Sequence, residues 1–399
     1  MIKLYFSLLF FVVANVVHAL VRDVPGLNGP IPPTNLANVK YYKKRPNEFQ
    51  HPGLWHTHDD LERMRIGVAS KQEPWYSAFS NFSTDSYSLS SYKMKGPYPV
   101  ISRGGISNYT SFTSDARAAW QNALMWYITR DPAHHNVSTS ILDGWGSNLT
   151  DIIGTDRSLL LGTEGLLFVN AAEIMRWEGN WTETGASWRG GSGFSVQLYW
   201  LFARQSIPIG QANYGMASIA ALLNYAVYLE DVSMYNYALD MLQNDPCAGF
   251  EANFDTRTGQ NGESGRDQGH AQVALGWTSL AAKTILSQGG DMWRDHNNLL
   301  LRGAEYAGAY NANRTVSYDP SFYRCEAVLV NGPWQTIANI SRGLNRPVYD
   351  LIYYQYRQRL RIKSKTIEEI KQLAPSEGHV TSADLPSWGD LLWPYNATA

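Results

Sequence analysis

The chain has 399 residues and a formal net charge of −2 at pH 7, with 44% hydrophobic and 13% aromatic residues. This near-neutral charge argues against a nucleic-acid partner, because nucleic-acid-binding domains carry a basic surface. The length allows a large buried core. The high aromatic share suits a sugar-binding cleft, although aromatic side chains also fill cores.

The first 19 residues have the features of a secretory signal peptide. Lys3 supplies a positive charge, residues 4–17 form an apolar stretch, and Val17-His18-Ala19 is a small-residue cleavage site. The apolar stretch is too short for a transmembrane helix, and no later segment is a candidate span. We therefore expect a soluble, secreted, extracellular protein without a membrane partner.

Glycosylation sequons and cysteines agree with export. Two cysteines, Cys247 and Cys325, either form one disulfide, worth about 2–4 kcal/mol, or remain as separate buried thiols. Eight Asn-x-Ser/Thr sequons are typical of a glycosylated eukaryotic secretory protein. These sequons begin at Asn81, Asn108, Asn136, Asn148, Asn180, Asn313, Asn339 and Asn396.

Residues 20–55 are rich in Pro and Asn and lack periodicity, so we expect an extended arm packed over a single domain of residues 56–399. Thr57 can cap a helix from His58 to about Val68, with Asp60 at the capping-box position. The run His56-Thr57-His58-Asp59 has residue types that bind metals, but a capping segment is the preferred interpretation.

Apolar residues at helical spacing predict most of the remaining elements. Few segments alternate with period 2, so little sheet is expected, and His134-His135 is interpreted as loop. The pattern indicates an all-α fold of helical hairpins curled into an incomplete α/α toroid. The predicted helices cover residues 116–129, 163–177, 194–204, 216–229, 234–242, 271–286, 299–310 and 348–360.

Two motifs carry chemistry, and the first is Gly210-Gln211-Ala212-Asn213-Tyr214, directly before an apolar helix. Asn213 is either an N-cap residue or a ligand contact. In isolation these two interpretations are evenly matched.

The second motif runs from Asn261 to His270 and contains Glu263, Arg266, Asp267 and His270. Their spacing places them on one face of a helix that starts near Ser264. The amino end of a helix favours a bound anion, so this motif predicts a charged ligand. The alternative is a structural ion-pair network that caps the helix.

These motifs resemble the alginate-lyase superfamily of polysaccharide lyases, especially its glucuronan- and mannuronan-cleaving branch. The resemblance covers most of residues 50–360 and is strongest in 263–272, Glu-Ser-Gly-Arg-Asp-Gln-Gly-His-Ala-Gln. It includes His51-Pro52-Gly53-Leu54-Trp55-His56-Thr57, residues 123–131, Asn213-Tyr214, residues 288–293 and residues 342–349. The resemblance implies a secreted or periplasmic α/α toroid that cleaves 1,4-linked uronic-acid polymers by β-elimination, without a required metal.

The resemblance also implies roles for individual residues. Asn213 and Arg266 would hold the substrate carboxylate, helped by Glu263 if that group is protonated, and His270 would abstract the proton or polarise the substrate. In relatives a His follows the Asn, whereas this chain has Tyr214. A tyrosine would be the acid, or both acid and base, with Tyr323 preferred over Tyr349 and Tyr214. The further substrate contacts would be Gln211, Tyr214, Asp267, Arg342, Arg346 and Tyr349.

Two other functions fit the sequence. One is an α/α-barrel glycoside hydrolase that uses Glu164 and Glu263 as its two carboxylates. The other is a non-catalytic glycan-binding protein on a lyase scaffold. For the lyase we expect an acidic polysaccharide substrate, no cofactor or metal, and a monomer.

Overall fold

The computed structural model describes residues 43–106, 108–184, 193–207, 209–344, 346–373 and 384–397. The signal peptide predicted for residues 1–19 and the arm up to residue 42 lie outside this part of the chain. Residues 43–56 contain no helix and pack over the body, as the Lys44 ammonium donates to the Gln288 carbonyl at 2.8 Å.

Helices of varied length make up most of the described chain, and two short strands, β1 (Val100–Ser102) and β2 (Asp151–Ile153), pair in parallel. The first helices are α2 (His58–Ala69), α3 (Trp75–Phe82), α4 (Tyr109–Thr129), α5 (Pro132–Asn148) and α6 (Arg157–Trp177). They are followed by α7 (Phe194–Gln197), the π-helix η2 (Leu198–Ala203), α8 (Arg204–Ser206), α9 (Ala212–Tyr228), α10 (Val232–Asn244) and α11 (Phe250–Asn253). The last are α12 (Gln268–Ser287), α13 (Asp295–Asn311), the 3-10 helix η3 (Ala327–Val330), α14 (Tyr349–Tyr354), the π-helix η4 (Gln355–Arg359), α15 (Lys365–Leu373) and α16 (Gly389–Leu392).

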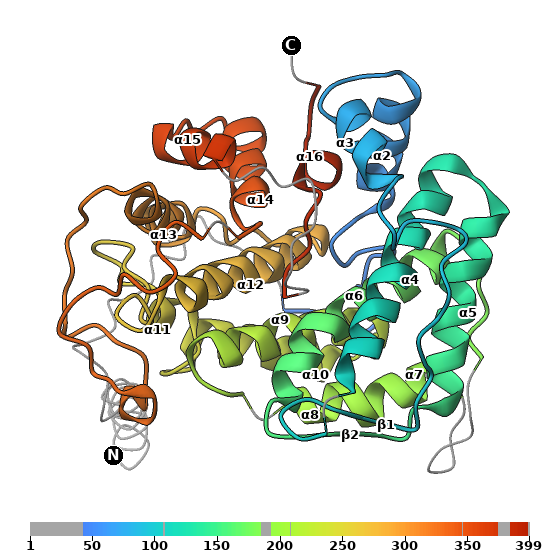
Figure 1. Ribbon diagram of the computed structural model, residues 1–399, viewed down its shortest axis with the longest axis horizontal. Helices are drawn as coiled ribbons and strands as arrows, with labels where there is room; N and C mark the ends of the chain where they lie inside the picture. The colour runs from blue at the N-terminus through green and yellow to red at the C-terminus, as the bar shows by residue number, and fades with distance from the viewer. Residues whose placement is uncertain are drawn as a thin grey trace, which may run out of the picture.

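Four long helices, α4, α6, α9 and α12, pack side by side as an inner layer, and α5, α10 and α13 lie outside them (Figure 1). The inner helices are buried on nearly all sides. Every residue of α6 from Leu160 to Met175 is buried, as is every residue of α9 except Tyr214. Helices with apolar residues on all faces occupy such a central position, and the polar residues they bury there need partners.

A ladder of buried amides fixes how three inner helices align. Asn170 of α6 donates to Asn224 of α9 at 3.0 Å, and Asn224 donates to the Thr284 hydroxyl of α12 at 3.1 Å. Each rung pairs positions late in its helix, so the three helices run in the same direction and all begin at the same rim. Because buried polar groups must be paired, the ladder favours one register.

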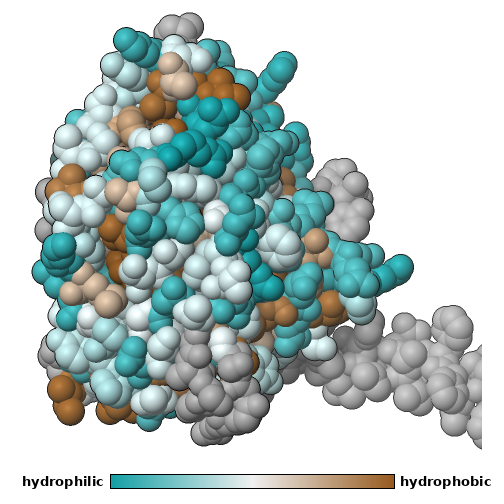
Figure 2. Space-filling view, turned by 90° about the vertical axis from the view of Figure 1, so that its right-hand side faces the viewer, coloured by the Kyte–Doolittle hydropathy of each residue, from teal (hydrophilic) through white to brown (hydrophobic). Residues whose placement is uncertain are grey.

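Helix α6 is also long and apolar enough to cross a membrane by length and composition, which the sequence analysis did not identify. In the structure 89% of its most apolar window is buried inside the molecule, as expected for a core helix. On the outer face shown in Figure 2, hydrophilic residues predominate and the hydrophobic ones form separate small patches.

The predicted helices are confirmed, mostly with earlier starts than expected. The Thr57 capping box is present, with Asp60 at 3.3 and 3.2 Å in the two reciprocal bonds. The interpretation of His134-His135 as loop was wrong, because both lie in α5, which Asp131 caps and Pro132 begins. Proline at the first helical position favours a helix start, so Pro132 marks the beginning of α5 as well as the end of the preceding helix.

Candidate active site

The amino ends of the four inner helices meet at one rim. Arg103, just after β1 and before α4, donates to the Thr163 hydroxyl of α6 at 3.4 Å. The Tyr214 hydroxyl, in the first turn of α9, donates to Asp156, directly before α6, at 3.2 Å. Asn213 of α9 contacts Glu263, which lies five residues before α12. The positive ends of these helix dipoles favour an anion here.

The two sequence motifs join at the Glu263 carboxylate, which is fully buried. Its Oε2 accepts from the Asn213 side-chain amide, and from the Asn213 backbone N–H at 3.3 Å. Its Oε1 accepts from Arg266 at 3.0 Å and from Arg324 at 3.1 Å. Glu263 therefore anchors Asn213 and Arg266 and has no exposed surface for a substrate. The expected direct contact between Glu263 and the substrate carboxylate was wrong.

The local structure of the second motif also differs from the prediction. Glu263 and Arg266 lie in a turn, and α12 begins only at Gln268 with Asp267 as its N-cap. The four charged residues therefore do not share a helix face. Gly265 lets Tyr318 and Trp334 pack closely against the turn, because a methyl group at this position would collide with both.

His270 and Asp267 form a dyad at the start of α12. The Asp267 carboxylate accepts from the His270 backbone N–H at 2.8 Å and lies 2.6 Å from the ring Nδ1. Burial acts to raise the Asp267 pKa, but hydrogen bonds from His270 and the charge of Arg266 outweigh it, so the pKa is lowered. An ionised carboxylate on Nδ1 orients the ring and directs Nε2 away from Asp267.

Tyr214 lies among three charges. Burial and then the charge of Asp156 raise its pKa, while the charges of Arg103 and Arg266 act to lower it. The net rise keeps the phenol protonated, which suits a proton donor. The Arg103 guanidinium stacks on the Tyr109 ring at 5.2 Å and lies 3.7 Å from Glu164 and 3.8 Å from Asp384.

The two predicted arginine contacts lie in different surroundings. Arg346 lies beside the first turn of α12 and pairs with Asp384 at 3.1 Å. Arg342 instead donates to the carbonyls of Tyr310 and Arg314, at 2.8 and 2.9 Å, and so braces the loop after α13.

The tyrosine candidates differ in their surroundings. Tyr349 is 1% exposed, and burial raises its pKa, so its predicted contact with the substrate was wrong. Tyr323 is half-buried, and its backbone lies against Gly262. The charge of Arg266 acts to lower the pKa of Tyr214, which places Tyr214 near that guanidinium.

Sequence reasoning missed Arg103 and Asp156 and gave Arg324 no site role of its own. Arg103 and Asp156 belong to loops far apart in the sequence and to no recognised motif, although an Asp directly before a helix was a usable signal. The predicted disulfide is present between Cys247 and Cys325. Among the described residues, no group of three His, Cys, Asp or Glu is arranged to hold a metal ion.

No family model and no curated protein matches this chain. Solved structures do. Alginate lyase A1-III from Sphingomonas species A1 is 12% identical, with a TM-score of 0.59 over 88% of this chain and 99% of that chain. A variant of alginate lyase A1-III complexed with a tetrasaccharide is 14% identical, with a TM-score of 0.54 over 91% and 98% of the two chains. An alginate lyase from Bacteroides ovatus is 10% identical, with a TM-score of 0.50 over 88% and 100%.

These comparisons establish the fold. The chain has the single-domain α/α toroid of the alginate lyases, as its motifs indicated.

Proposed function

We propose that this protein is a polysaccharide lyase that cleaves a 1,4-linked uronic-acid polymer, glucuronan or mannuronan, by β-elimination. The observation that carries the proposal is the cluster of Asn213, Arg266, His270 and Tyr214 at one rim of the toroid, organised by buried Glu263. The alginate-lyase fold supports it.

The chemistry requires a cation at the substrate carboxylate. The C5 proton of a uronate is a very weak acid while the carboxylate carries its charge, so an enzyme must neutralise that charge first. Arg266 takes this role because 22% of its side chain is exposed, whereas Asn213 is 1% exposed and supports it from beneath. Preorganised donors of this kind usually make the largest electrostatic contribution to catalysis.

The proton transfers are assigned to His270 and Tyr214. His270 takes the C5 proton on Nε2, because Asp267 holds Nδ1 and stabilises the imidazolium that forms. Tyr214 donates its hydroxyl proton to the departing 4-oxygen, since its raised pKa keeps it protonated. The electron pair of the C5–H bond forms the C4–C5 double bond as the C4–O bond breaks. No step requires a metal or a cofactor.

The hydrolase alternative fits the site less well. A glycoside hydrolase needs two carboxyl groups that reach the glycosidic bond. Glu164 is 2% exposed and accepts from the Thr113 hydroxyl at 2.9 Å, and Glu263 is buried beneath two arginines. A glycan-binding protein without activity would have no need of the Asp267–His270 dyad.

Export, glycosylation and a monomeric state belong to the same proposal. Seven of the eight sequon asparagines are exposed, which suits glycosylation.

One absorbance assay tests the proposal. The protein is incubated with glucuronan and, separately, with polymannuronate, and formation of the 4,5-unsaturated uronate is followed in the ultraviolet. We expect new absorbance with at least one polymer, and its loss in Arg266→Ala. A fall in viscosity without new absorbance would identify a hydrolase instead. If neither viscosity nor absorbance changes, the glycan-binding function is the remaining one.

A further inference from the structure

Arg324 is a buried arginine with a partner at the centre of the site. Its side chain is 7% exposed and donates to Glu263 Oε1 at 3.1 Å. Its backbone N–H also donates to the Gly262 carbonyl at 2.9 Å. The loop that carries Arg324 therefore packs against the turn that carries Glu263.

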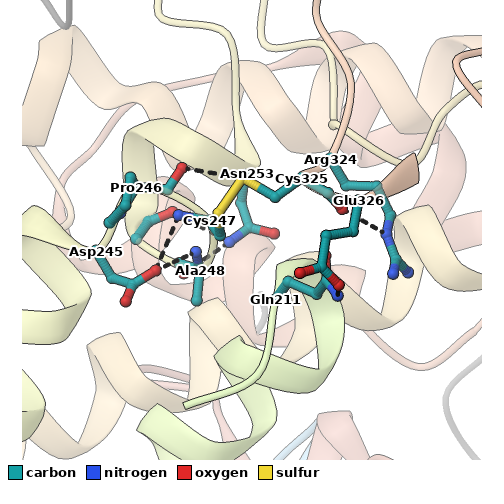
Figure 3. The surroundings of a disulfide bond; sticks show 10 residues. Gln211, Asp245, Pro246, Cys247, Ala248, Asn253, Arg324, Cys325 and Glu326 are labelled. Carbon is teal, nitrogen blue, oxygen red and sulfur yellow. Dashed lines mark hydrogen bonds between the residues drawn. A yellow bond between two sulfur atoms is a disulfide. The ribbon is translucent and has the colours of Figure 1, made fainter. Parts of the chain in front are cut away.

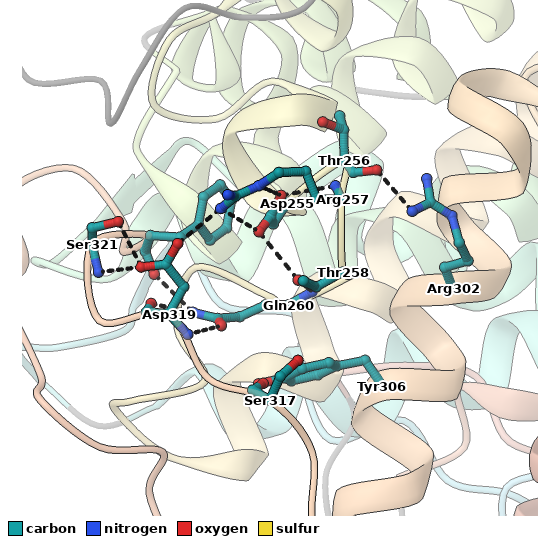
Figure 4. Close-up of polar contacts among 11 residues, drawn as sticks. Asp255, Thr256, Arg257, Thr258, Gln260, Arg302, Tyr306, Ser317, Asp319 and Ser321 are labelled. Carbon is teal, nitrogen blue, oxygen red and sulfur yellow. Dashed lines mark hydrogen bonds and ion pairs between the residues drawn. The ribbon is translucent and has the colours of Figure 1, made fainter.

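Buried Gln260 anchors this loop before Arg324 (Figure 4). Its side-chain amide donates to the carbonyls of Asp319 and Phe322 at 2.9 and 3.0 Å, and its oxygen accepts from the Asp319 N–H at 2.8 Å. Arg257 adds an ion pair to Asp319 at 2.8 Å. An amide that is buried with all of these bonds made fixes the backbone it contacts.

A disulfide anchors the loop after Arg324 (Figure 3). Cys325 is bonded to Cys247, whose carbonyl accepts from the Ala212 N–H at 2.8 Å, one residue before Asn213. Gln211 also donates to Glu326 at 2.6 Å. The disulfide thus joins the loop of Arg324 to the first turn of α9.

These anchors matter because of the charge balance at Glu263. Glu263, when ionised, lies between the guanidiniums of Arg266 and Arg324, and the Asp267 carboxylate lies 3.7 Å from Arg266, so these two carboxylates and two arginines balance in charge. Without Arg324 the group would carry a net charge of −1, and both carboxylates would act on Arg266 alone. Arg324 therefore offsets Glu263 and leaves more of the Arg266 charge to a ligand.

We propose that Arg324, held between Gln260 and the Cys247–Cys325 disulfide, is a positioning residue that sets the geometry and charge of Arg266 and Asn213 through Glu263. The inference rests on the proposed lyase function. It concerns a residue that contacts no substrate itself and acts only through the buried carboxylate.

The test compares Arg324→Gln, which keeps a hydrogen-bond donor but loses the charge, with Arg324→Lys, which keeps the charge. The control Arg359→Gln loses the same charge from an ion pair with Asp291, at 2.9 and 3.2 Å, that is not part of the candidate site. The measurements are kcat and KM on the cleaved uronan, with circular dichroism and thermal melting to establish folding.

We expect Arg324→Gln to lower kcat about 10- to 100-fold, the effect of removing a unit charge roughly 6–10 Å away at an effective dielectric constant of about 20. KM should change less, because negative charge on the carboxylate grows in the transition state. The kcat of Arg324→Lys should lie between those of wild type and Arg324→Gln, and the kcat of Arg359→Gln should match wild type.

The outcomes separate the two proposals. A wild-type protein that yields no unsaturated product overturns the lyase function itself. An active wild type with an equally active, folded Arg324→Gln overturns the role of Arg324 alone. If Arg324→Gln does not fold, the test rests on Arg324→Lys, which should lower kcat with little change in KM. An Arg324→Lys variant with the kcat and KM of wild type would refute the proposal.

The disulfide has its own variant, Cys247→Ser with Cys325→Ser, which keeps Arg324 but releases the loop. Its kcat should fall by less than in Arg324→Gln. Unchanged kcat would remove the disulfide from the proposal.

Discussion

Tyr214 is the one residue of α9 that is not buried, and His270 is one of two such residues in α12. Both α9 and α12 are therefore buried along nearly all of their length, and each has a partly exposed titratable side chain only in its first turn. The first turn is where the helix dipole acts on a neighbouring charge. The position of these two side chains supports their proposed roles in proton transfer.

Tyr214→Phe tests the assignment of the acid. Removing the hydroxyl should lower kcat about 10²- to 10⁴-fold, the usual effect of general acid–base catalysis, with little loss of stability because the ring remains. The same assay on Tyr323→Phe is the matched comparison. If Tyr323→Phe loses activity and Tyr214→Phe does not, the acid is Tyr323, as the sequence analysis preferred.

His296 gives a prediction for stability against pH. It lies 2.8 Å from both Glu251 and Asp295; burial acts to lower its pKa, but these two carboxylates raise it to about 9. The stabilisation that comes from this raised pKa is fully present at pH values below the pKa of histidine in the unfolded chain, about 6.5. That stabilisation is lost as the pH rises through about 9.

The melting temperature should therefore fall between pH 6.5 and 9, and His296→Asn should remove this dependence. Asparagine suits the site because the His296 backbone has φ 47°, in the left-handed region that Asn tolerates. Parallel pH slopes for wild type and His296→Asn would contradict the assignment.

At the scale of elements, the amide ladder joins three of the four inner helices. Asn224 bonds to both Asn170 and Thr284, so it connects α6, α9 and α12 near the end opposite the site.

Asn224→Ala should lower the free energy of unfolding by about 1–3 kcal/mol, because it leaves buried polar groups unpaired. The control is Asn244→Ala, which removes an exposed amide from α10 and should change stability by less than about 0.5 kcal/mol. Chemical denaturation measures both, and equal losses would show that the ladder adds nothing.

The helices were predictable because their apolar spacing is local information. Residues 271–286 carry it clearly, and α12 extends beyond them by three residues at the start and one at the end. Helix α5 was missed because its Ser, Thr, Asn and Gly residues weaken the pattern.

The site was predictable only within its motifs. Asn213 and Arg266 belong to recognisable segments, whereas Arg103 and Asp156 reach the rim because parallel helices bring distant loops together. No local pattern records that arrangement, and the burial of Tyr349 likewise depends on packing across helices.

At the scale of the whole molecule, the sequons allow a test of the proposed export. Asn108 is the exception among them, because it is half-buried and both ends of its amide are occupied. Its nitrogen, the atom a glycan would modify, donates to the Val100 carbonyl at 2.9 Å, and its oxygen accepts from the Ser102 N–H at 2.8 Å.

Peptide mapping of protein secreted from a eukaryotic host should find glycans on exposed sequons such as Asn136 and Asn313, and none on Asn108. Enzymatic deglycosylation should lower the mass of the secreted protein. A fully modified Asn108 would mean that glycan attachment precedes the formation of β1, and an unmodified protein would refute the glycosylation.

The common direction of the inner helices has a consequence for how the proposed enzyme can change. Its reactive groups occupy the loops and first turns at one mouth of the ring, and the amide ladder joins the helices toward the other mouth. Under the proposed function, selection for a new sugar polymer can therefore alter the first set of residues while the second continues to hold α6, α9 and α12 together. Divergent specificities can in this way arise on one unchanged frame.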